Sequence, residues 1–367
     1  MRVMKYELRK LFGFPLMWGL LAVFLGFNFY IIHSEVGYHE FQKSLHGVYN
    51  VMVGHETSSE YYDLYTHYHD SVSGSYDTLD MRKIKEMKEN MCYYYPTGSY
   101  AELIDNNYET LQKRLEEIIA DGDSDGMFYP GDVFQIHKKI YLIMKVCLIE
   151  MIIMMCFSVL YLMDFERLNR TEALVFSCRI GRTDMRLKLA AGVLGGLLFS
   201  VMILCLSFAV FLALVPMRGL WSTPVNSVMV MESSGVWEYP FITFVPLTIG
   251  KEFFLSIAVT LLLVLLFGIL SGAVQLYVHN SYLTMIGCAV GFVVLMLLPF
   301  IVKNACWLKT FVCLTPSSLW YYCSRWFIEN DLPVSFAWSE FITLGIWFVI
   351  SIILMLVGKS YLKSKDI

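Results

Sequence analysis

Charged residues are scarce in this chain of 367 residues, at 16% of the total, whereas soluble domains carry about 25%. The deficit is concentrated in uncharged runs of roughly twenty residues, and 57% of all residues are hydrophobic. Such runs are long enough to cross the hydrocarbon core of a bilayer as helices. The composition therefore predicts an all-α protein that crosses a membrane several times.

Several motifs of enzymes and of metal proteins are also missing. The sequence contains no GxxxxGK[ST] loop for ATP, no HExxH and no GxSxG, so we expect no phosphoryl transfer or hydrolysis by this chain itself. Its nine cysteines include no CxxC pair, which argues against a metal knuckle or a disulfide framework. The first apolar run is too long for the core of a signal peptide and is expected to stay as a span.

What is present is a set of six apolar runs separated by polar segments. We expect a cytoplasmic interfacial helix over residues 1–11 and a mainly helical extracytoplasmic domain between the first two spans, over residues 34–139. The membrane domain then continues over residues 140–367. The six predicted spans cover residues 12–33, 140–163, 190–215, 253–277, 282–302 and 341–357.

The distribution of basic residues predicts the orientation. Thirteen Lys and Arg residues lie in the N-terminal segment, the 164–188 loop and the C-terminal tail, against five in the two short loops of the other side. Short loops rich in Lys and Arg stay in the cytoplasm. We therefore expect both termini in the cytoplasm and, because no targeting peptide is evident, a multi-pass protein of the plasma membrane. Membrane lipid is the expected surrounding, and no feature indicates nucleic acid as a partner.

The 34–139 segment is acidic, with nineteen Asp and Glu against nine Lys and Arg. Ser99 and Glu102 form a capping-box pattern, which predicts the start of a helix. The apolar residues that follow step by three and four, which predicts one buried stripe ending near residue 120; they are Ile104, Tyr108, Leu111, Leu115 and Ile118.

The acidic stretch DGDSDGMFYPGD over residues 121–132 resembles a calcium loop. Acidic residues at relative positions one, three, five and twelve, with glycine at six, match the template. The candidate ligands are Asp121, Asp123, Asp125 and Asp132. Position twelve is an aspartate instead of the usual glutamate, and a solvated acidic turn is the alternative.

Two ionisable residues, Lys145 and Glu150, fall within the second span. A charge in hydrocarbon is energetically costly, so each of these residues is expected to have a stabilising environment or a functional role. Lys145 is near one end of the span and is able to snorkel. Glu150 is near mid-depth, and it either faces a polar cavity or basic partner or is protonated and bonded within the bundle.

Three GxxxG pairs lie inside predicted spans, and they favour close helix packing; they are Gly192/Gly196, Gly268/Gly272 and Gly287/Gly291. Three cysteines share the outer side of the predicted topology and leave one disulfide possible, with the pairing open; they are Cys306, Cys313 and Cys323.

Two stretches resemble the permease subunits of the type two ATP-binding-cassette (ABC) transporter family. The first is KYELRKLFG at residues 5–13, similar to the basic helix that precedes the first span in that family. The second is FERLNRTEALVFSCRIGRTDMRLKLAAG at residues 165–192, similar to its cytoplasmic loop. The Gly-Thr pair that usually follows the glutamate in this loop is absent here.

The resemblance implies an exporter whose ATP is hydrolysed by a separate cytoplasmic ATPase, and a dimer with a second permease chain, identical or related. The ATPase would contact the loop through Glu166, Glu172, Arg179, Arg182, Arg186 and Lys188. An alternative interpretation is a membrane sensor or regulatory protein whose outer domain binds a ligand or peptide without transport. A membrane enzyme is a third, which the lack of a convergent catalytic set disfavours.

Overall fold

A computed structural model of the chain describes residues 2–55, 60–72, 74–91, 98–123, 128–130, 135–171, 184–230, 240–302, 307–329 and 336–365. Over these ranges the chain is helical and contains no strand, only two isolated bridges, Pro224 to Thr248 and Thr243 to Ile328. The predicted all-α class is confirmed for this part of the chain.

In the described part of the chain, six helices are long and apolar enough to cross a membrane, as predicted. They begin and end within a few residues of the predicted spans, and most extend beyond them. Their bounds are α2 Pro15–Val36, α7 Ile136–Leu168, α9 Asp184–Leu214, α11 Ile249–Val278, α12 Ser281–Ile301 and α15 Ser339–Lys365. In α9 and α15 the apolar, span-like portion is Met185–Leu214 and Ser339–Gly358.

Helix α7 is the centre of this bundle and packs against α2, α9 and α11. Glycines on the neighbouring helices allow the close approach. A Cβ atom on Gly192 of α9 would lie 2.7 Å from the Val159 Cα atom of α7, and one on Gly268 of α11 would lie 2.7 Å from the Met155 sulfur. Two of the three GxxxG pairs therefore lie against α7, as expected for small residues at a helix interface in lipid.

The third pair, Gly287 and Gly291 of α12, has no atom within 4 Å of its added Cβ positions. Helix α12 follows α11 after the short turn at His279 and Asn280. The Asn280 side chain accepts hydrogen bonds from two backbone N–H groups in the first turn of α12 and so caps this helix.

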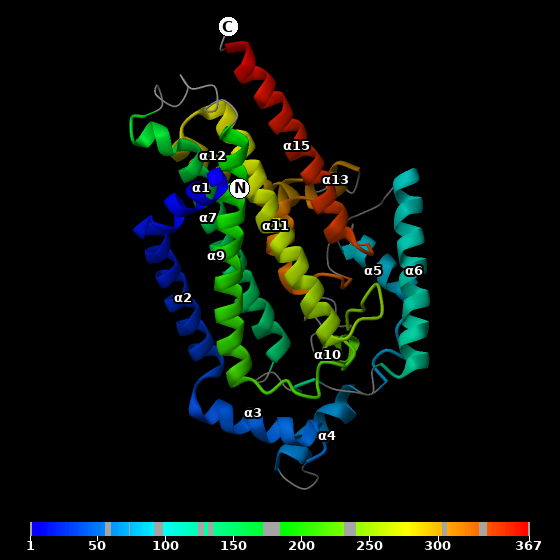
Figure 1. The fold of residues 1–367 in the computed structure, drawn as a ribbon. Helices are drawn as coiled ribbons and strands as arrows, with labels where there is room; N and C mark the ends of the chain where they lie inside the picture. Colours follow the sequence, from blue (N-terminus) through cyan, green and yellow to red (C-terminus); the bar gives the residue numbers. More distant parts are fainter. Residues whose placement is uncertain are drawn as a thin grey trace.

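The remaining helices lie at the ends and along one side of the bundle (Figure 1). Helix α1, Arg2–Phe12, precedes α2. Four helices separate α2 from α7, namely α3 His39–Met52, α4 Glu60–Val72, α5 Met81–Met91 and α6 Ser99–Asp121. Short helices occur in the later connections, namely α10 Asn226–Met229, α13 Trp307–Cys313, α14 Pro316–Tyr321 and the 3-10 helix η1 Cys323–Arg325.

The α3–α6 module, defined here as residues 39–121, shares one hydrophobic core with the bundle. Phe41 and Leu45 of α3 and Leu111 of α6 are buried in the same cluster as Met144 of α7. In Figure 1, α3 and α4 lie at the end where α2 ends, and α5 and α6 lie at the side of the bundle beside the start of α15, whereas the C-terminus lies at the other end, beyond α1. We call these the module end and the α1 end of the bundle.

Helix α6 confirms the predicted stripe but not the predicted cap. Ile104, Leu111 and Ile118 are buried on one face. The N-cap residue is Gly98, with φ of 63°, and Ser99 is already helical without a capping hydrogen bond from its side chain. The helix begins at Ser99 as predicted, but the N-cap role of Ser99 is wrong, because the chain turns into the helix at a glycine that tolerates positive φ.

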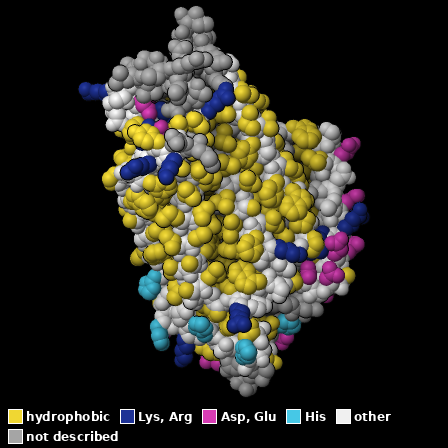
Figure 2. Space-filling model, in the orientation of Figure 1, with side chains coloured by type: hydrophobic (Ala, Val, Ile, Leu, Met, Phe, Trp, Pro, Cys, Tyr) yellow, Lys and Arg dark blue, Asp and Glu magenta, His cyan; other side chains and the backbone are white. Residues whose placement is uncertain are grey.

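Side-chain types are segregated over the surface. Figure 2 shows hydrophobic side chains across the middle of one face, with charged side chains near its upper end and along its lower and right edges, and histidines toward the lower edge. A broad apolar surface between polar ends is the expected exterior of a protein embedded in a bilayer. The chain is therefore a multi-pass membrane protein.

Candidate functional site

Ion pairs join three helices at the α1 end of the bundle. Glu166, in the last turn of α7, forms an ion pair with Lys188 of α9 and accepts a hydrogen bond from Lys10 of α1 at 3.1 Å. Lys10 also pairs with Glu7 at 2.7 Å, and Glu7 is 2% exposed. These four residues, the α1-end cluster, contain two positive and two negative charges in contact.

The α1-end cluster also shifts the pKa of Lys10. Burial alone lowers the pKa of this ammonium group, but the hydrogen bonds to Glu7 and Glu166 outweigh burial and raise the pKa above its ordinary value. Lys10 therefore stays charged at physiological pH. Because its Nζ atom also lies 4.5 Å from the ring centre of Phe165 on α7, both charge and packing hold α1 against α7.

The predicted ATPase-contact residues separate into three groups. Glu166 and Lys188 are buried in the α1-end cluster, so their side chains are used within the chain. Arg186, near the start of α9, is exposed. Glu172, Arg179 and Arg182 lie outside the described residues. Contact with an ATPase stays a prediction for all six.

Glu150 lies inside the bundle and is 4% exposed. Its Oε2 atom accepts a hydrogen bond of 2.7 Å from the Asn28 amide of α2. The same amide nitrogen lies 3.0 Å from Ser207 Oγ of α9. Of the two alternatives for Glu150, the structure shows bonding within the bundle, and none of the ion pairs among the described residues includes it.

Lys145 reaches away from Glu150. Its ammonium group donates a hydrogen bond of 2.9 Å to the Tyr321 carbonyl and lies 4.9 Å from the ring centres of Trp320 and Tyr321. The half-buried stem and the aromatic partners agree with the predicted snorkelling toward one end of the span.

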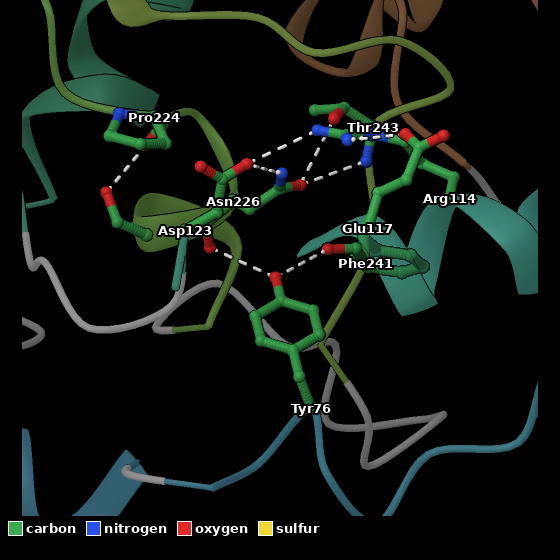
Figure 3. Close-up of polar contacts among 9 residues, drawn as sticks. Tyr76, Arg114, Glu117, Asp123, Pro224, Asn226, Phe241 and Thr243 are labelled. Carbon is green, nitrogen blue, oxygen red and sulfur yellow. Dashed lines mark hydrogen bonds and ion pairs between the residues drawn. The ribbon is translucent and has the colours of Figure 1, made fainter. Parts of the chain in front are cut away.

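The acidic segment after α6 belongs to a polar network with the α9–α11 connection (Figure 3). Asp123 Oδ2 accepts hydrogen bonds of 3.3 Å from both Arg114 and Asn226. The Asn226 side-chain oxygen accepts two more from Thr243. Tyr76 donates to the carbonyls of Asn226 and Phe241, at 3.0 and 3.1 Å.

This network fixes the module to the bundle. Tyr76 is 1% exposed, and burial, together with the nearby Asp123 carboxylate, raises the pKa of its phenol well above the usual range. The phenol therefore stays protonated and keeps its two hydrogen bonds. A second link is the buried ion pair between Lys88 of α5 and Glu329, which follows η1.

The calcium-loop residues are only partly described. Asp121 is exposed at the end of α6, and Asp123 accepts hydrogen bonds from Arg114 and Asn226. Asp125 and Asp132 lie outside the described residues. Within the described ranges no group of three or more His, Cys, Asp or Glu side chains is placed to hold a metal. Calcium binding stays a prediction.

The structure also describes two of the three cysteines left open for a disulfide. Cys313 and Cys323 are both buried free thiols, so they are not paired with each other. Cys306 lies outside the described residues.

Sequence reasoning missed several buried polar residues. Asn28 and Ser207 are uncharged and do not interrupt an apolar run, although an amide inside a span was a usable signal. His137 and Glu252, near the module ends of α7 and α11, form a buried pair with 3.1 Å between Nε2 and Oε2. Both lie at span boundaries, where charged residues are ordinary, so their pairing was not visible in one sequence.

Comparison of the chain with protein-family models, with curated proteins and with solved structures finds no match.

Proposed function

We propose that the chain is a permease subunit of an ABC-type exporter in a bacterial plasma membrane. In this proposal the chain forms part of a transport path, and a separate cytoplasmic ATPase supplies the energy. A second permease chain, identical or related, completes the path. Both termini lie in the cytoplasm, and the α1 end of the bundle is the cytoplasmic end.

The observation that supports this proposal most directly is the α1-end cluster. The connection between α7 and α9 is the segment assigned to the ATPase, and the residues on either side of it, Glu166 and Lys188, pair with each other and with Lys10 of α1. A force applied to the connection would therefore reach α7, α9 and α1 together. Helix α1 leads into α2 after a turn at Gly13 and Phe14, so the movement extends to a fourth helix.

ATP binding would change the conformation only if the ATPase prefers one arrangement of these helices. The exposed Arg186, in the first turn of α9, is the described residue best placed for a contact that distinguishes the arrangements. Charged contacts of this kind also bring the two partners together faster.

The test is to purify the tagged chain from its native membrane in mild detergent and identify the proteins that accompany it. We expect an ATPase in stoichiometric amount, and we expect the double variant Arg182→Glu, Arg186→Glu to lose it. Lys113→Glu is the matched control, because Lys113 is exposed on α6 in the module and should leave association unchanged. Association that survives the double variant would contradict the loop assignment.

A sensor or regulatory protein is the second candidate. The polar network of Tyr76, Asp123 and Asn226 supports it, because a ligand bound to the α3–α6 module would act on residues that contact the α9–α11 connection. Purification without any ATPase, from membranes in which an exporter control retains its own, would favour this function over the permease.

A further inference from the structure

Three polar side chains meet near the middle of α7, each from a different helix. They are Asn28 of α2, Glu150 of α7 and Ser207 of α9, with 1%, 4% and 0% of their surfaces exposed. The Asn28 amide nitrogen is 2.7 Å from Glu150 Oε2 and 3.0 Å from Ser207 Oγ. We call these three residues the mid-bundle cluster.

The mid-bundle cluster contains a carboxyl group without a cation. None of the Lys, Arg and His residues that form ion pairs in the described ranges contacts Glu150. Two buried oxygens, Glu150 Oε1 and Asn28 Oδ1, have no hydrogen-bond partner among the residues that the structure describes. A negative charge that is buried in hydrocarbon without a nearby cation is energetically costly. Glu150 is therefore expected to bind a positively charged species from outside the bundle.

We propose that the mid-bundle cluster is a proton-binding site within the membrane. The proton comes from water at one membrane surface and forms an O–H bond at Glu150 Oε2, which converts the carboxylate into a neutral carboxylic acid. Release reverses this step and returns the proton to water. No electron transfer and no other reactant is involved.

Asn28 is suited to both protonation states of Glu150. When the carboxylate is ionised, the amide nitrogen of Asn28 donates to Oε2. When Oε2 carries the proton, a half-turn of the amide brings its carbonyl oxygen to the same position, where it accepts from the new O–H group. The separation of 2.7 Å lies within the range of both bonds, so neither state requires the two side chains to move apart.

A metal ion fits the mid-bundle cluster less well. Calcium takes about six to eight oxygen ligands and magnesium demands near-octahedral geometry. The cluster has two unpartnered oxygens, and its amide nitrogen faces the carboxylate. A proton needs only the single acceptor that the carboxylate provides.

The titratable groups nearest to the mid-bundle cluster are thiols, and the nearest cation on α7 is Lys145, five residues before Glu150. Cys147, on α7, lies 3.5 Å from the Asn28 amide nitrogen, and Cys323 of η1 lies near enough to Cys147 to interact with it electrostatically. Helices α2 and α9 contribute Asn28 and Ser207, and neither residue is titratable. Toward the module end of α7, the next buried acidic group is Glu252, which is paired with His137.

Proton binding would alter how α2 packs on α7 and α9, because Asn28 is the residue of α2 that bonds to both. This inference does not depend on an ATPase partner. A proton that leaves by the opposite surface would make the chain a proton-coupled transporter, and one that returns by the same surface would make it a pH sensor.

Infrared difference spectroscopy on the full chain in lipid nanodiscs tests the proposal, because protonated carboxylic acids have their own C=O stretching band. We expect such a band to grow as the pH is lowered, to be absent in Glu150→Gln and to persist in Glu252→Gln, which changes a different buried acid. A band assigned to Glu150 that does not respond to pH, or no such band, would overturn the proposal.

A second variant keeps the test decisive if Glu150→Gln does not fold. Asn28→Leu removes the donor to the ionised carboxylate, and hydrogen bonds to charged groups are the stronger ones. The pH midpoint of the Glu150 band should therefore rise by about one unit. An unchanged midpoint would contradict the role assigned to Asn28.

Discussion

Helices α7 and α12 have the same mean hydropathy, yet 67% of the residues in the apolar window of α7 are buried and only 11% of those in α12. The difference lies in their polar residues and in their neighbours. Glu150, Ser158 and Glu166 of α7 each bond to another helix. Exposed apolar side chains such as Ile286 and Val290 dominate α12. The side chains of Ser281 and Thr284, at the start of α12, also bond to α7 and α11, whereas the polar contacts of α7 are spread along its length. Hydropathy therefore predicts which segments cross the membrane, and polar contacts spread along a helix mark the central one.

The largest expected effect comes from breaking the Glu166–Lys188 pair, which links α7 to α9. Lys188→Met leaves a buried carboxylate with fewer partners and should cost about 3 kcal/mol of unfolding free energy. Thermal unfolding in nanodiscs measures the loss. The double variant Glu166→Gln, Lys188→Met removes both charges and should recover part of it, and a double variant no more stable than Lys188→Met would contradict a dominant charge effect.

The next largest effect concerns glycine packing, which differs between Gly192 of α9, facing α7, and Gly287 of α12. Gly192→Ala brings a Cβ atom to within 2.7 Å of the α7 backbone at Val159, and overpacking of this kind should cost about 2 kcal/mol. The matched control is Gly287→Ala on α12, where the added Cβ atom meets nothing within 4 Å. Equal unfolding temperatures for the two variants would show that α7 and α12 are not packed as differently as described.

A smaller effect is expected from the hydrogen bond between Ser158 of α7 and the Gly192 carbonyl of α9, at 2.8 Å. Interhelical hydrogen bonds in membranes contribute about 0.6 kcal/mol on average. Ser158→Ala should therefore lower the unfolding free energy by about that amount. A loss as large as that of Gly192→Ala would mean that this bond contributes far more than the average.

The smallest effect concerns the pH dependence of the contact between α1 and α7. The pKa of Lys10 is raised in the folded chain by its bonds to Glu7 and Glu166, which outweigh the lowering by burial. Its stabilisation is therefore fully present below the ordinary lysine pKa of 10.5 and is lost as the pH rises through the raised value.

Thermal unfolding across the alkaline range, compared with Lys10→Met, isolates this contribution from those of other groups. The stability difference between the two proteins should shrink above pH 10.5. A difference that stays constant with pH would mean that the lysine stabilises the fold through its aliphatic stem only.

Particular residues show how far sequence reasoning extends. The stripe from Ile104 to Ile118 was predicted correctly, because a helix period of 3.6 residues fixes which side chains share a face. The cap at Ser99 was wrong, because the choice of the N-cap residue depends on the backbone angles, and Gly98 has the positive φ. Local periodicity is readable from residue types, whereas capping depends on where the preceding chain comes from.

In the candidate sites too, residue types indicated which positions are unusual, whereas the partners of those residues depended on the tertiary structure. Glu150 was singled out from its depth in an apolar run, but its hydrogen-bond donor, Asn28, lies 122 residues away on α2. Asn28 in turn bonds to Ser207 of α9. Glu166 and Lys188 were predicted to contact a partner protein. The structure gives both an intramolecular partner, because the ends of α7 and α9 meet beside α1.

The sequence by itself determined the number of spans, the all-α class and the position of Glu150 inside a span. Each of these depends on short stretches of composition, and the bilayer sets the length that such a stretch needs. Only the tertiary structure decided which span is central, which glycine pairs are covered and which polar groups meet. Those features depend on contacts between segments far apart in the chain, and residues of the same type, such as Gly192 and Gly287, differ only in what lies opposite them.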